Sequence, residues 1–158
     1  MESVGESRPV VELVLGLVIL TFIIFVHGVG IRTIYREFSR AWVGVEASGT
    51  QWRVNLILAT TVASMAGLHL VETLLWALPI SQAGLIPSLR DSYFYVLESY
   101  TTLGEGNVAL PEKWRLVGPM IAMSGLFTFG WTGSVLVNIM TEFGKFDRVQ
   151  ARKDKDAS

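Results

Sequence analysis

The chain has 158 residues, of which 51% are hydrophobic and 17% are charged, and its net charge is −1. A mean hydropathy of +0.45 excludes an ordinary soluble domain of this length, and the lack of cysteine excludes disulfides and thiolate metal sites. Apolar runs at 10–31, 56–80 and 116–140 are each long enough to cross a membrane, which takes about 20 residues of helix. Because backbone groups in lipid must pair internally, these runs predict an all-α membrane protein with three transmembrane helices per chain.

The N-terminal region, residues 1–53, is predicted to hold an extra transmembrane helix at about 10–33, followed by an arginine-rich segment. Residues 1–9 lack the positive region of a secretory signal, so we expect this helix to be retained. Basic residues also gather in the predicted polar tail, 142–158. The positive-inside rule therefore places the arginine-rich segment and the C-terminus in the cytoplasm, and the N-terminus and residues 81–113 outside.

The second predicted helix, 54–80, carries two ionisable residues, His69 and Glu72, three positions apart and so on one face. Their spacing favours buried hydrogen bonding toward the short helix that follows. The alternative is a membrane metalloenzyme that uses this pair, but a catalytic zinc site usually needs three protein ligands. The other histidine, His27, is expected near the opposite membrane face, and the chain is not expected to be an enzyme.

Residues 91–100 predict a short helix capped by Asp91 or Ser92, too short to span a membrane yet aromatic enough to be buried at membrane depth. It leads into Thr-Thr-Leu-Gly-Glu-Gly at 101–106, where the glycines permit backbone angles that β-carbons forbid. Irregular backbone at this depth is tolerated where it lines a water-filled cavity, and the C-terminal end of a helix favours cations. The pattern therefore predicts a strand whose carbonyls replace an ion's hydration shell. The alternative is an extracellular loop with a glycine turn.

The last predicted helix, 114–141, is expected to border the same passage. Five of its residues are predicted to line or gate it: Ser124, Gly125, Thr128, Trp131 and Thr132. The hydroxyl residues recur every four positions, so they share a face that can border an aqueous cavity. Trp131 lies near this stripe and would narrow it, and a hydrophobic constriction can gate by dewetting. Gly125 removes a side chain where two helices can approach closely.

Residues 69–140 resemble the two-transmembrane potassium-channel family, the pore module of the tetrameric cation channels, and most closely its small bacterial members. The resemblance is carried by His-Leu-Val-Glu at 69–72, Tyr-Thr-Thr-Leu-Gly-Glu-Gly at 100–106, Trp-Arg-Leu-Val-Gly at 114–118 and Gly-Leu-Phe-Thr-Phe-Gly-Trp at 125–131. It implies a pore module over 54–141, a homotetramer in the bacterial inner membrane, and a gating hinge at Gly125. It also implies a selectivity filter at Thr101, Thr102, Leu103, Gly104, Glu105 and Gly106, supported by Glu98, Tyr100 and Asn107.

Two residues depart from the family pattern. Glu105 stands where the potassium filter carries tyrosine, and Asn107 stands where aspartate usually follows. A buried carboxylate without partners is costly, so Glu105 either accepts hydrogen bonds from donors such as Tyr100 or Asn107 or faces the entrance. Several carboxylates on one axis would repel one another and retain Ca2+ or Mg2+.

The same Gly-Glu pair resembles the filter of cyclic-nucleotide-gated channels, which are weakly selective cation pores. We therefore expect a channel for K+ or Na+ with weak potassium selectivity or divalent sensitivity. Its expected partners are the lipid bilayer, further copies of the chain and permeant cations, with no nucleic acid and no cofactor. The alternative is a non-conducting, channel-like structural or regulatory membrane protein.

Overall fold

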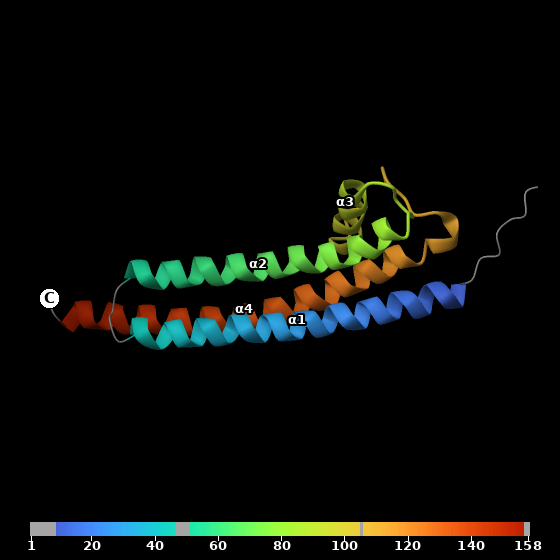
Figure 1. Ribbon diagram of the computed structural model, residues 1–158. Coiled ribbons are helices and arrows are strands. Elements are labelled where there is room, and N and C mark those ends of the chain that lie inside the picture. The colour runs from blue at the N-terminus through green and yellow to red at the C-terminus, as the bar shows by residue number, and fades with distance from the viewer. Residues whose placement is uncertain (1–8, 47–50, 105, 157–158) are drawn as a thin grey trace, which may run out of the picture. The chain divides into compact units, whose positions relative to one another are not determined.

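The computed structural model describes residues 9–46, 51–104 and 106–156, and these residues form helices and loops without a strand. The elements in chain order are α1 (Pro9–Glu46), α2 (Gln51–Gln82), α3 (Leu89–Tyr100), the short 3-10 helix η1 (Glu112–Trp114) and α4 (Val117–Asp156) (Figure 1). Helices α1, α2 and α4 are long and apolar enough to cross a membrane. The prediction of an all-α membrane fold is thereby confirmed.

Two of the long helices extend beyond their apolar runs. Helix α1 continues to Glu46, past the expected end near residue 33, and α4 continues to Asp156 through the segment predicted as a polar tail. Arginine, lysine and glutamate are good helix formers, and both extensions carry exposed ion pairs one turn apart. Arg40 lies 2.5 Å from Glu37 in α1, and Lys145 lies 2.6 Å from Glu142 in α4.

Helix α3 is short because both of its ends are fixed by local sequence. Ser88 is the N-cap, and its side chain accepts a hydrogen bond from the backbone N–H of Asp91, so the cap lies upstream of the predicted Asp91 or Ser92. At the other end Thr102 N–H donates to Ser99 O (3.1 Å) and Leu103 N–H donates to Glu98 O (2.8 Å). This pair of bonds is a Schellman motif, which ends the helix immediately before the predicted filter.

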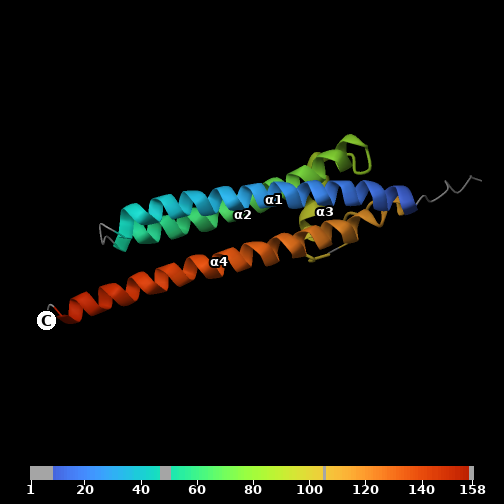
Figure 2. The ribbon, with the colours of Figure 1, turned by 90° about the horizontal axis from the view of Figure 1, so that it is seen from below.

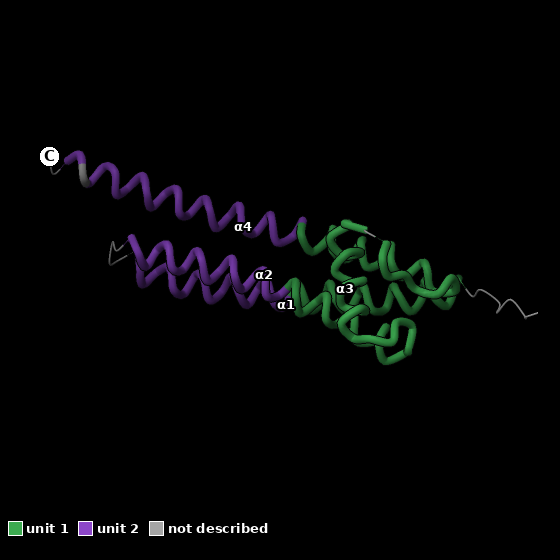
Figure 3. The backbone as a smooth tube through the Cα atoms, turned by 90° about the horizontal axis from the view of Figure 1, so that it is seen from above, with its two compact units in different colours: residues 1–28, 69–129 green, residues 29–68, 130–158 purple. Residues whose placement is uncertain are grey.

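The chain divides into two compact units, and each long helix contributes a segment to both (Figure 3). Unit 1 comprises residues 1–28 and 69–129, and unit 2 comprises residues 29–68 and 130–158. In unit 2 the core combines aromatic and aliphatic side chains, with Trp42 against Phe143 at a ring separation of 4.7 Å. Unit 1 contains α3 and the predicted filter.

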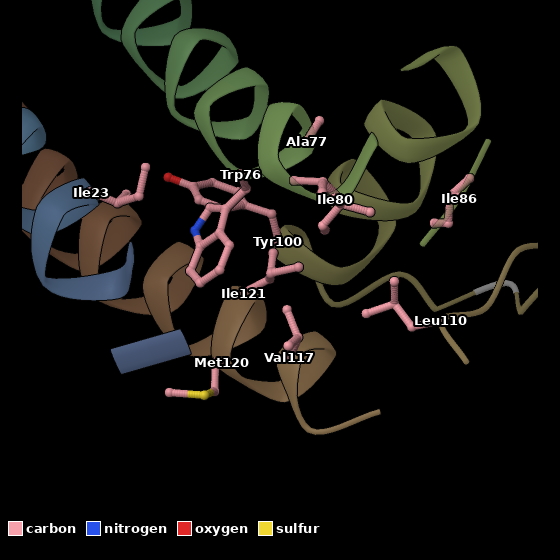
Figure 4. Packing of buried hydrophobic residues seen from close by; sticks show 11 residues of the cluster. Ile23, Trp76, Ala77, Ile80, Ile86, Tyr100, Leu110, Val117, Met120 and Ile121 are labelled. Carbon is pink, nitrogen blue, oxygen red and sulfur yellow. The ribbon is translucent and has the colours of Figure 1, made fainter. Parts of the chain in front are cut away.

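Within unit 1, α3 lies beside the C-terminal part of α2 and the N-terminal part of α4 (Figures 1 and 2). Buried apolar side chains gather around Trp76, with Ile23 from α1 and Ile121 from α4 next to it (Figure 4). The Trp76 indole N–H donates to Ser124 Oγ at 3.0 Å, which satisfies its one polar atom in this dry setting. This core holds α3 in place between two membrane-spanning helices.

Candidate functional site

The described residues of the predicted filter follow α3 without a linker. Positive φ angles recur at every second residue: Thr102 (59°), Gly104 (61°) and Gly106 (76°). Regular extended backbone would point successive carbonyls to opposite sides, and a left-handed angle at alternate residues breaks that alternation. A segment with this backbone can turn several carbonyls toward one side.

No part of the chain that the structure describes covers this segment. Thr101, Thr102, Leu103, Gly104 and Gly106 are all exposed, and Leu103 is 64% exposed although it is apolar. Asn107 is exposed as well. Glu105 lies outside the described residues, so the predicted hydrogen bonds to its carboxylate are not described.

Tyr100, the residue before the filter, is held by side chains from two other helices. Its hydroxyl donates to Glu72 Oε2 at 2.5 Å and lies 2.5 Å from Thr128 Oγ1 in α4. His69 Nδ1 lies 3.0 Å from the same hydroxyl. The predicted hydrogen bonding from His69 and Glu72 toward the short helix is therefore confirmed. Glu98, the other predicted support, is buried at 4% exposure.

Glu72 is the centre of a buried polar cluster, which we define as His27, His69, Glu72, Tyr100 and Thr128. His27 Nδ1 lies 2.8 Å from Glu72 Oε1, and both side chains have no exposed surface. His69 Nδ1 lies 3.4 Å from Glu72 Oε2, and the two imidazole rings stack at 5.5 Å. The cluster thus links α1, α2, α3 and α4 around Tyr100, the residue that immediately precedes the predicted filter.

The position of His27 corrects the sequence prediction, which placed it near the membrane face opposite to His69. Helix α1 runs from Pro9 to Glu46, so His27 lies at its middle rather than at its inner end. A buried carboxylate within a membrane-spanning helix requires partners, and the imidazole of His27 supplies one. The sequence signal for this contact is that both apolar runs contain ionisable residues: His27 lies in the first run, and Glu72 lies in the second.

Within the chain, two of the hydroxyl residues predicted to line the passage lie on the buried side of α4. Ser124 and Thr128 have no exposed surface, and their hydroxyls donate to the carbonyls of Ile121 (2.7 Å) and Ser124 (3.0 Å) in their own helix. A β-carbon at Gly125 would collide with the backbone carbonyl of Tyr100. These three residues pack against α2 and α3, whereas Trp131 is exposed and Thr132 is half-buried.

Glu12 lies in the first turn of α1 and is 4% exposed. Its Oε2 accepts a hydrogen bond from the backbone N–H of Leu116 at 3.1 Å. Leu116 immediately precedes α4, so the carboxylate sits at the positive end of that helix, where negative charge is stabilising. The sequence signal that could have indicated this contact is a single acidic residue at the start of an apolar helix.

A family model described as an ion channel matches residues 55–142, more than half of the chain. The chain belongs to the two-transmembrane-helix potassium-channel family. The matched range of this channel family covers most of α2, all of α3, the predicted filter and the membrane-spanning part of α4, and it leaves α1 outside. The protein is an integral membrane protein of the ion-channel type and not an enzyme. The chain has no significant match among curated proteins or solved structures.

Proposed function

We propose that the protein is a monovalent cation channel whose selectivity filter is formed by residues 101–106. The proposal rests on one observation above all: α3 ends in a Schellman motif that leads directly into alternating positive φ angles. The C-terminal end of a helix favours cations, and carbonyls that face one axis can replace their hydration shell. Support also comes from Tyr100, whose hydroxyl is held by side chains from α2 and α4.

We propose further that the pore is a homotetramer. One chain supplies a single filter segment, and several copies are needed to surround an ion with carbonyl oxygens. The exposure of Leu103 supports this assembly. Its apolar side chain is uncovered within one chain, and neighbouring copies would bury it. The distribution of arginine supports a filter entrance on the outer side of the membrane, and the family resemblance supports the inner membrane of a bacterium. Trp131, exposed on α4, keeps its proposed role as an inner constriction.

Ion preference follows in this proposal from Glu105. Its carboxylate replaces the aromatic side chain that braces a potassium filter, so we expect weak discrimination between K+ and Na+. Carboxylates from neighbouring copies would lie around one axis, where they attract divalent cations because Ca2+ and Mg2+ prefer oxygen ligands. External Ca2+ or Mg2+ should therefore reduce the monovalent current.

Reversal potentials of the purified protein in planar bilayers test this proposal under bi-ionic K+ and Na+ conditions. We expect Glu105→Tyr to raise the K+ over Na+ permeability ratio by about tenfold or more, equivalent to about 1.4 kcal/mol, and to abolish divalent block. Glu112→Tyr, the same exchange at an exposed acid in the same outer segment, should change neither property.

Two results would contradict this function. The first is a wild-type preference for K+ as steep as that of an ordinary potassium channel, which would show that Glu105 does not weaken selectivity. The second is a wild type without flux in which Glu105→Tyr creates conduction. That outcome would favour the alternative of a non-conducting, channel-like regulatory protein.

A further inference from the structure

We propose that His27, His69 and Glu72 bind one divalent transition-metal ion of the zinc type. One ligand atom from each residue lies within 4.8 Å of the other two. Two imidazoles and one carboxylate are donors that zinc commonly takes, at about 2.0–2.2 Å from the metal. Ligand atoms around one tetrahedral ion then lie roughly 3.4 Å apart. His69 Nδ1 lies at that separation from Glu72 Oε2 (3.4 Å), whereas His27 Nδ1 lies closer to Glu72 Oε1 (2.8 Å) and would move outward slightly to share the ion.

Charge and burial favour a cation at this position. The Glu72 side chain has no exposed surface and lies within a membrane-spanning helix, where a carboxylate needs compensation. Histidine binds a metal ion as the neutral imidazole and glutamate as the carboxylate, so the three ligands together would carry one negative charge, which a divalent ion would offset. His69 is 11% exposed whereas His27 and Glu72 are not, so an ion would enter from the His69 side.

Tyr100 acts as a positioning residue for this site and not as a ligand. Its hydroxyl donates to Glu72 Oε2 at 2.5 Å, which fixes the orientation of the carboxylate. Outer hydrogen bonds of this kind orient metal ligands and raise their affinity. Thr128, 2.5 Å from the same hydroxyl, holds Tyr100 in turn.

The site is separate from the proposed filter. A bound ion would cross-link α1 and α2 next to Tyr100, the residue that precedes the filter. Binding at this position does not require that the protein conduct, so it can be measured on the purified chain whether or not the proposed channel function holds.

The test uses the full chain without a histidine tag, purified in detergent, stripped of metal with a chelator and titrated with Zn2+. We expect one ion per chain by calorimetry and elemental analysis. His27→Gln, His69→Gln and Glu72→Gln should each weaken binding by about 100-fold or more, and Tyr100→Phe by about 10- to 100-fold. Glu37→Gln, which alters an exposed carboxylate on α1, should leave the affinity unchanged.

A second measurement needs only the wild type, in case a ligand variant fails to fold. The chain has two histidines, both in the proposed site, so their ring NMR signals report on it without ambiguity. Both signals should shift with one equivalent of Zn2+. The proposal is overturned if folded wild type binds no Zn2+, if binding leaves both ring signals in place, or if folded ligand variants keep the wild-type affinity.

Discussion

Thr102 occupies a backbone position that glycine usually takes. Helix α2 ends in the same Schellman motif as α3, with Gly84 N–H donating to Ser81 O at 3.0 Å and Leu85 N–H donating to Ile80 O at 3.1 Å. The left-handed residue is Gly84 in α2 (φ 67°) and Thr102 in α3 (φ 59°). A β-branched residue in this conformation costs about 1–2 kcal/mol, and strain of this kind is found mostly at functional sites.

Exchanging the residues at these two helix ends should therefore have opposite effects on stability. Thr102→Gly should raise the free energy of unfolding by up to about 1 kcal/mol, because relief of strain exceeds the added freedom of the unfolded chain. Gly84→Thr should lower it by about 1–2 kcal/mol. Thermal or denaturant unfolding of the purified protein measures both. Equal losses of stability in the two variants would show that Thr102 is not strained.

At the scale of elements, the contact between α3 and α4 depends on one residue without a side chain. A β-carbon at Gly125 would meet the carbonyl carbon of Tyr100 at 3.0 Å and the carbonyl oxygen closer still. Both are backbone atoms at the end of a helix, so they cannot rotate away as a side chain can. Gly125 therefore sets how closely α4 approaches the last turn of α3.

Gly125→Ala should destabilise the protein by about 1–3 kcal/mol, because overpacking forces the two backbones apart. It should also alter ion flux, since Tyr100 precedes the proposed filter. Gly130→Ala on the same helix is the matched control, because a β-carbon there meets no atom within 4 Å. The control should stabilise the helix by up to about 1 kcal/mol. If both variants behave alike in unfolding experiments, the close approach at Gly125 is not required.

The elements themselves could be predicted from the sequence, because membrane-spanning helices require apolar runs of a definite length. The ends of α1 and α4 could not, since their charged extensions fit a helix or a solvated segment equally well by composition. The partners of Glu72 were only partly predictable. His69 is three residues away in the same helix, whereas His27 meets Glu72 through the register between α1 and α2, which no local pattern encodes.

At the scale of the whole molecule, α1 lies outside the family-matched range 55–142 but supplies two buried partners to residues within it. Glu12 accepts from the backbone of Leu116, and His27 faces Glu72. Both contacts lie in unit 1, which also contains the proposed filter. We therefore infer that α1 is energetically coupled to the pore-forming part of the chain rather than simply adjacent to it.

A double-mutant cycle on His27 and Glu72, run with a metal chelator present, measures that coupling. His27→Leu alone should cost about 1–3 kcal/mol, because it leaves one carboxylate oxygen of Glu72 buried without its donor. Adding Glu72→Leu removes the orphaned charge, so the double variant should be more stable than the sum of single effects predicts, by about 0.5–3 kcal/mol. The exposed pair Arg40 and Glu37, replaced in the same way, should give a coupling of only about 0.3–0.5 kcal/mol. Strict additivity at the buried pair would mean that α1 is bound by its apolar surface alone.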